Sequence, residues 1–100
     1  MATKKKTARP ARPYVVVRTY SAGVHVGELV SRTGPEVALA NARRIWSWRE
    51  RVTLHEIANR GVGAGSRVSE PVSEITLTGA IEIIQTTPVA AANLRAAVWT

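Results

Sequence analysis

The sequence contains no cysteine, no aspartate and no phenylalanine among its 100 residues. The absence of cysteine excludes disulfide frameworks, thiolate nucleophiles and cysteine-ligated zinc or iron–sulfur sites. Carboxylates come only from seven glutamates, which with two histidines leave few ligands for a metal ion. No run approaches the roughly 18 apolar residues of a membrane-spanning helix. We therefore expect no metal, no cofactor and no membrane segment.

Basic residues exceed acidic ones, and the excess is uneven along the chain. The formal net charge is +7, yet residues 14–100 hold nine arginines against seven glutamates. Residues 1–13 contain two prolines, no acidic residue and five cations, namely Lys4, Lys5, Lys6, Arg9 and Arg12. This pattern predicts a disordered basic arm over residues 1–13, able to contact nucleic-acid phosphates or to act as a solubilising tail. No apolar stretch follows the cations, so the arm is not expected to be a secretory signal.

The remaining residues have the composition of one folded domain. Hydrophobic residues make up 45% of the chain and charged residues 21%, as in ordinary globular proteins. A length of 100 residues favours one domain, here residues 14–100. Because only five residues are aromatic, the core is thin, and we expect a homo-oligomer.

The first half of this domain has the pattern of strands. Residues 14–20 and 24–31 are rich in β-branched residues and are separated by a short glycine-containing link. Gly27 inside the second run suggests a bulge or a close backbone approach. A turn is expected at residues 33–36 around Pro35.

Residues 37–48 are ambiguous between helix and strand. Alanine, leucine and arginine favour a helix, but residues 44–48 alternate and no hydroxyl residue caps the segment. We favour a strand that is bent near Asn41.

The second half combines helices and strands. Thr53 and Glu56 form a capping-box pattern, which predicts a helix over about residues 54–60, ended by Gly61 and followed by a flexible loop. Pro71 makes residues 68–72 an edge strand or a link, and residues 75–84 are expected to be one strand. Thr87 and Pro88 begin a final helix through residue 97. The expected fold is α+β, a small mainly antiparallel sheet of about four or five strands with two short helices.

One segment gathers cations and aromatics within nine residues, and its members are Arg43, Arg44, Trp46, Trp48, Arg49 and Arg51. Guanidinium groups and indoles at this density can contact phosphates and stack on bases. On a strand, Arg44, Trp46 and Trp48 would share one face, and Arg43 the other. The alternative is that the tryptophans lie in the core or in a subunit interface, with the arginines solvated or paired to Glu50 and Glu56.

Catalytic patterns are weak. His55 and Glu56 are adjacent, so on a helix they point about 100° apart, and His25 has no acidic neighbour in the sequence. Residues 61–66 contain Gly-x-Gly without the strand, helix and lysine of a phosphate loop. We predict no catalytic residue.

Several segments resemble an uncharacterised family of small proteins encoded by tailed bacteriophages and prophages. The most specific is Ala-Arg-Arg-Ile-Trp-x-Trp at residues 42–48, and the others are residues 17–27, 54–61 and 75–83. The resemblance implies a phage gene product in the host cytoplasm and brings no known reaction.

The leading hypothesis is a non-enzymatic phage accessory protein, a small oligomer that binds a polyanion, either nucleic acid or a nucleotide. One alternative is a virion or assembly protein whose arm anchors to the capsid or to DNA. Another is an inhibitor of a host factor with Trp46 and Trp48 as interface anchors.

Overall fold

A computed structural model describes residues 12–48, 51 and 53–98. The strands are β1 (Tyr14–Thr19), β2 (Val24–Thr33), β3 (Glu36–Ser47), β4 (Arg67–Val68), β5 (Val72–Leu77) and β6 (Ala80–Gln85), and the helices are α2 (Leu54–Arg60) and α3 (Pro88–Ala96).

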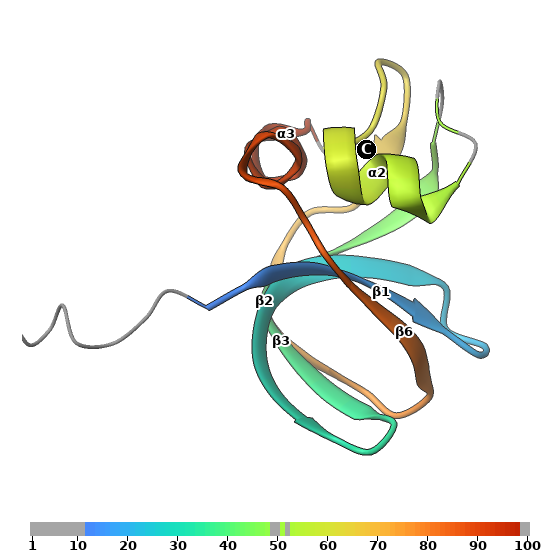
Figure 1. Cartoon of the computed structure of the whole chain (residues 1–100), viewed down its shortest axis with the longest axis vertical. Helices are drawn as coiled ribbons and strands as arrows, with labels where there is room; N and C mark the ends of the chain where they lie inside the picture. The colour runs from blue at the N-terminus through green and yellow to red at the C-terminus, as the bar shows by residue number, and fades with distance from the viewer. Residues whose placement is uncertain (1–11, 49–50, 52, 99–100) are drawn as a thin grey trace, which may run out of the picture.

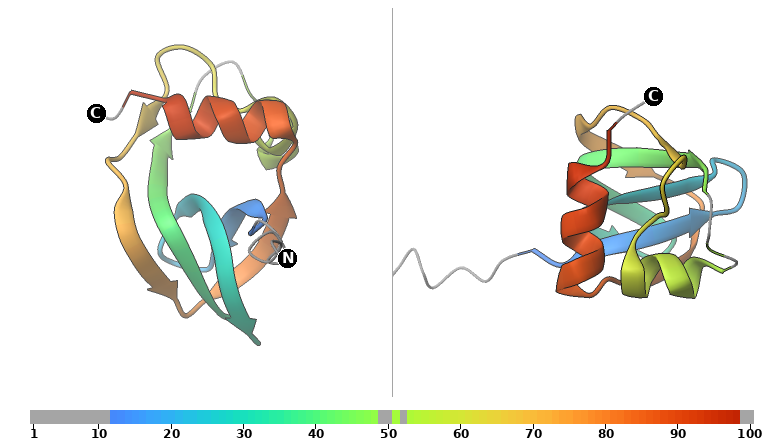
Figure 2. Two further views of the ribbon diagram at one scale, coloured as in Figure 1. Left: turned by 90° about the vertical axis from the view of Figure 1, so that its left-hand side faces the viewer. Right: turned by 90° about the horizontal axis from the view of Figure 1, so that it is seen from above.

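All strand pairs are antiparallel, in the order β4-β3-β2-β1-β6. β5 also pairs with β3, along residues 37–42, whereas β4 pairs with residues 45–47 of the same strand. The sheet is strongly curved, and α2 and α3 lie together over one side of it (Figures 1 and 2). The expectation of an α+β fold with a mainly antiparallel sheet and two short helices is therefore confirmed for the described residues. The expected strand number is wrong, because these residues form six strands.

The additional strand arises where the run 75–84 breaks at Thr78 and Gly79. The amide of Tyr20 donates to the carbonyl of Gly79 at 2.8 Å, and the amide of Ala80 donates to the carbonyl of Pro35 at 3.0 Å. These bonds fix the chain between the β1–β2 turn and the β2–β3 turn. At this point the chain leaves β5, which pairs with β3, and enters β6, which pairs with β1. β5 and β6 are consequently two strands on two different neighbours.

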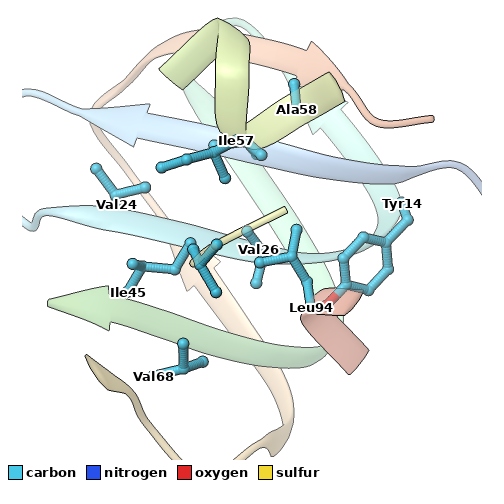
Figure 3. Close-up of a cluster of buried hydrophobic side chains, with 10 residues drawn as sticks. Tyr14, Val24, Val26, Ile45, Ile57, Ala58, Val68 and Leu94 are labelled. Carbon is cyan, nitrogen blue, oxygen red and sulfur yellow. The ribbon is translucent and has the colours of Figure 1, made fainter. Parts of the chain in front are cut away.

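Hydrophobic side chains form two clusters. One lies between the sheet and the helices, with the labelled side chains converging in Figure 3, and its buried members are Tyr14, Val16, Val24, Val26, Ile45, Ile57, Ala58, Val62, Val68 and Leu94. The other consists of Val15, Val17, Val37, Leu39, Ala42 and Leu77. Because neighbouring residues of β1 alternate between the clusters, the clusters occupy opposite faces of the sheet.

The ambiguous segment is strand β3, as favoured above. Asn41 has φ 50°, and the register with β2 shifts between Val26 and Glu28. Gly27 lies against this bulge, where a Cβ would be 3.0 Å from the carbonyl oxygen of Ala40. The expected bend near Asn41 and the close approach at Gly27 are thus confirmed.

Both helices begin where their caps predict. In α2 the Thr53 hydroxyl accepts from the amide of Glu56, and the Glu56 carboxylate accepts from the amide of Thr53. In α3 the Thr87 hydroxyl accepts from the amide of Ala90. Within the described ranges, no helix is long and apolar enough to cross a bilayer.

Candidate binding site on strand β3

The residues of the predicted Arg/Trp segment separate into exposed and buried positions. Arg44 is exposed and Trp46 is 52% exposed, whereas Arg43 is only 4% exposed. Trp48 and Arg51 are partly buried, and Arg49 lies outside the described residues. The segment is therefore not one continuous ligand surface.

Arg43 holds the end of helix α3. Its guanidinium donates to the carbonyls of Leu94 at 2.8 Å, Arg95 at 3.2 Å and Ala97 at 2.6 Å, and to that of Ser69 at 2.9 Å. The last carbonyls of a helix lack intrahelical partners and carry partial negative charge. This buried cation satisfies them, so the donors of Arg43 are used inside the fold and its role is structural.

Trp48 and Arg51 also contact the folded body. Trp48 packs against the cluster beneath the helices, which contains Ile45, and the Arg51 Nε donates to the carbonyl of Gly61 at 2.9 Å. A register shift between Ile45 and Ser47 changes the alternation at the end of β3. The expected shared face of Arg44, Trp46 and Trp48 is consequently wrong for Trp48.

An exposed patch remains at the end of β3. The guanidinium of Arg67 on β4 lies 5.2 Å from the centroid of the Trp46 ring, in a cation–π contact. Arg44 projects from the same strand as Trp46, two residues earlier. We call Arg44, Trp46 and Arg67 the β3 patch.

The two cations of the β3 patch are not neutralised by carboxylates of the described residues. The salt bridges among the described residues involve other arginines, and the pairs are Arg12–Glu28, Arg18–Glu82, Arg60–Glu56 and Arg95–Glu28. Arg12 is the single described cation of the predicted arm, and its Nη1 lies 4.0 Å from Glu28 Oε1. Lys4, Lys5, Lys6 and Arg9 lie outside the described residues.

A pocket of about 290 Å³ includes Arg44 in its wall, and its other lining residues are His25, Ala42, Arg43, Ser69, Glu70, Val72 and Ile75. It forms where the partner of β3 changes. β5 pairs with β3 as far as Ala42, β4 pairs from Ile45 onward, and Ser69 lies between them. The Ser69 hydroxyl accepts from the amide of Arg44, and the Ser69 amide donates to the Arg44 carbonyl, both at 2.8 Å. We call this space the β4–β5 pocket.

His25 places a neutral acceptor in the pocket wall. Its Nε2 lies 2.9 Å from the carbonyl oxygen of Ala22, which can only accept, so Nε2 carries the proton. Nδ1 is then the unprotonated acceptor. Burial lowers the pKa of His25, opposed by the hydrogen bond to Ala22 and assisted by the positive charge of Arg44.

Of the β3 patch, the sequence pattern singled out Arg44 and Trp46, whereas Arg67 and most of the pocket residues were not among the predicted site residues. Arg67 is separated from Trp46 by the whole of α2 and its loops, so no local spacing relates the two. Among the described residues, no group of three or more potential metal ligands is present.

The fold and the patch define a small curved-sheet protein with an exposed cation–aromatic surface and an adjoining pocket. The chain belongs to the family described as a domain of unknown function (DUF6948), whose model matches residues 12–94. No curated protein and no solved structure matches it. The matched range begins at Arg12, so most of the basic arm precedes the family domain.

Proposed function

We propose that this protein is a non-enzymatic module that binds single-stranded nucleic acid on the β3 patch. The observation that carries the proposal is the exposed Trp46 ring with the Arg67 guanidinium over it, on a strand that also exposes Arg44 two residues earlier. A base can stack on an exposed indole only when it is free of a duplex stack, and such stacking contributes about 1–3 kcal/mol per base. The positive charge of Arg44 and Arg67 complements the phosphates that flank the stacked base.

The basic arm adds sequence-independent affinity to this proposal. Each phosphate neutralised on a single strand contributes about −0.7 to the slope of log K against log salt concentration. The patch contains two cations, and residues 1–13 contain five, of which Arg12 lies 4.0 Å from Glu28. Replacement of Lys4, Lys5 and Lys6 by glutamine should therefore flatten the salt dependence while leaving the contribution of Trp46 unchanged.

The resemblance to phage proteins adds a biological context to the proposal. In that setting the protein is an oligomeric accessory protein in the cytoplasm of an infected cell, where single-stranded intermediates occur. A virion component would instead be found in purified particles at constant stoichiometry. An inhibitor of a host factor would retain its protein partner after nuclease treatment.

Fluorescence anisotropy of a labelled thymidine oligomer tests the proposed function directly. Trp46→Ala should weaken binding by about tenfold or more, and Trp46→Phe should restore most of the affinity because it keeps an aromatic face. Arg44→Ala should also weaken binding. Arg32→Ala is the matched control for removal of one exposed arginine, because Arg44 pairs with His25 at one end of β2 and Arg32 lies at the other end of that strand. Wild-type affinity in both Trp46→Ala and Arg44→Ala would refute the proposal, as would absence of binding at low salt.

A further inference from the structure

The β4–β5 pocket adjoins the β3 patch through a shared residue. Arg44 belongs to both, so a strand lying on the patch passes the mouth of the pocket. Val72 and Ile75 give the pocket apolar walls, while Arg44 offers donors, and His25 and Glu70 offer acceptors. An apolar space with a few polar groups of both kinds is typical of a site for a small planar polar molecule.

The polar groups of the pocket are left available by the fold. Arg44 and Glu70 carry opposite charges in the lining of the pocket, yet within residues 12–48, 51 and 53–98 neither forms a salt bridge. The Glu70 main chain is fixed next to Ser69, whose hydroxyl donates to the Glu70 carbonyl at 3.0 Å. His25 is 1% exposed and its Nε2 is occupied by Ala22. The Arg44 guanidinium and the Glu70 carboxylate can therefore both bind a ligand, because they do not form a salt bridge with each other.

The size of the pocket limits its occupant. Pockets for drug-sized ligands have volumes of about 300–1,000 Å³, and this one, at about 290 Å³, is just below that range. It can hold one heterocyclic ring system, with the attached sugar and phosphate outside.

We infer that the β4–β5 pocket binds one guanine base of the strand that lies on the β3 patch; the inference rests on the proposed function. Guanine presents the adjacent acceptors O6 and N7, which match the donor fork of an arginine such as Arg44. Its N2 amino group and N1–H are donors, matching the carboxylate of Glu70 or the Nδ1 of His25. Adenine would place its N6 amino donor against the Arg44 guanidinium, and thymine lacks an amino group. The pocket thus gives the module a base preference that the patch alone cannot give.

The test compares three oligomers of about 15 nucleotides, a length near the upper end of known single-strand site sizes. One contains thymidines only, one has a single central guanosine, and one has a single central adenosine. Anisotropy titrations of the full chain should show binding about tenfold tighter to the guanosine oligomer than to the other two.

Two variants assign such a preference to the pocket. Val72→Phe fills the pocket from a position that is 45% exposed, so the fold should tolerate it. Glu70→Gln removes the carboxylate at an exposed position. Both should abolish the preference for guanosine and keep the affinity for the thymidine oligomer. Thr76→Phe is the matched control, because Thr76 lies on the same strand outside the pocket.

The outcomes separate the two proposals. Equal affinity of wild type for all three oligomers, or a guanosine preference that survives in both Val72→Phe and Glu70→Gln, overturns the pocket inference and leaves the proposed function intact. Absence of binding to any oligomer overturns both. Loss of the preference in the two pocket variants, with Thr76→Phe unaffected, supports the assignment.

Discussion

Replacement of Arg43 is expected to destabilise the fold strongly. Its guanidinium donates to four main-chain carbonyls, three of them at the C-terminal end of α3 and one at Ser69 between β4 and β5. The side chain therefore ties the last helix to the centre of the sheet. In Arg43→Ala those carbonyls lose their donors, and a space opens beneath α3 because Arg43 is 4% exposed.

The magnitude follows from the number and kind of these bonds. A hydrogen bond to a charged group contributes about 1.5–3 kcal/mol, but four bonds from one side chain are not additive. The removed cation also cost free energy to bury, which offsets part of the loss. We expect Arg43→Ala to lower the free energy of unfolding by about 3–5 kcal/mol. Arg43→Lys keeps the charge but lacks the planar fork, and should cost about half as much.

Urea unfolding followed by tryptophan fluorescence measures the effect. Arg60→Ala is the control, because Arg60 makes a single exposed salt bridge of 3.5 Å to Glu56, a kind of pair that contributes about 0.3–0.5 kcal/mol. A change below about 1 kcal/mol in Arg43→Ala, similar to that in Arg60→Ala, would refute the structural role. Arg43 would then be free to act as the ligand-binding residue that its sequence neighbours suggested.

Two further predictions concern the sheet. Gly27→Ala should cost about 1–3 kcal/mol, because its Cβ would lie 3.0 Å from the Ala40 carbonyl oxygen, while in the control Gly79→Ala the nearest atom is 3.8 Å away; equal melting temperatures of the two variants would contradict the close approach. Burial lowers the pKa of His25 below its ordinary 6.5, so the unfolded chain takes up a proton that the folded chain does not. The free energy of unfolding should be highest above about pH 6.5 and should fall as the pH drops through the folded pKa, and His25→Gln should flatten this dependence in urea titrations at several pH values.

The sequence predicted those structural features that depend on contacts between residues close in the chain. The capping box of Thr53 and Glu56 spans three residues, so its hydrogen bonds form whenever that turn is helical. The alternation of residues 44–48 favoured a strand, and the bend expected near Asn41 is present there, at a residue type that tolerates the observed positive φ better than most. In such cases the atoms that interact are close in the sequence.

Long-range contacts explain what the sequence could not predict. Arg43 and Arg44 are adjacent and chemically identical, yet one is buried beneath α3 and the other faces solvent. The difference depends on carbonyls 51 to 54 residues away. The break at Gly79 was missed for a similar reason, since the alternation of apolar residues continues across it. The hydrogen bonds that hold the break come from Tyr20 and Pro35.

The distribution of the arginines shows why total charge is a poor guide to binding here. Nine arginines lie in residues 14–100, but several of them already have partners within the fold. Arg43 caps a helix, and Arg18 is paired to Glu82 at 3.0 Å. Arg44 and Arg67, by contrast, have no carboxylate partner in the part of the chain that the structure describes; Arg67 lies over the Trp46 ring, and Arg44 is exposed on the same strand as Trp46. A domain with a small net charge can therefore still present a local anion-binding site. The position of unpaired cations near an aromatic ring matters more for such a site than the total number of cations.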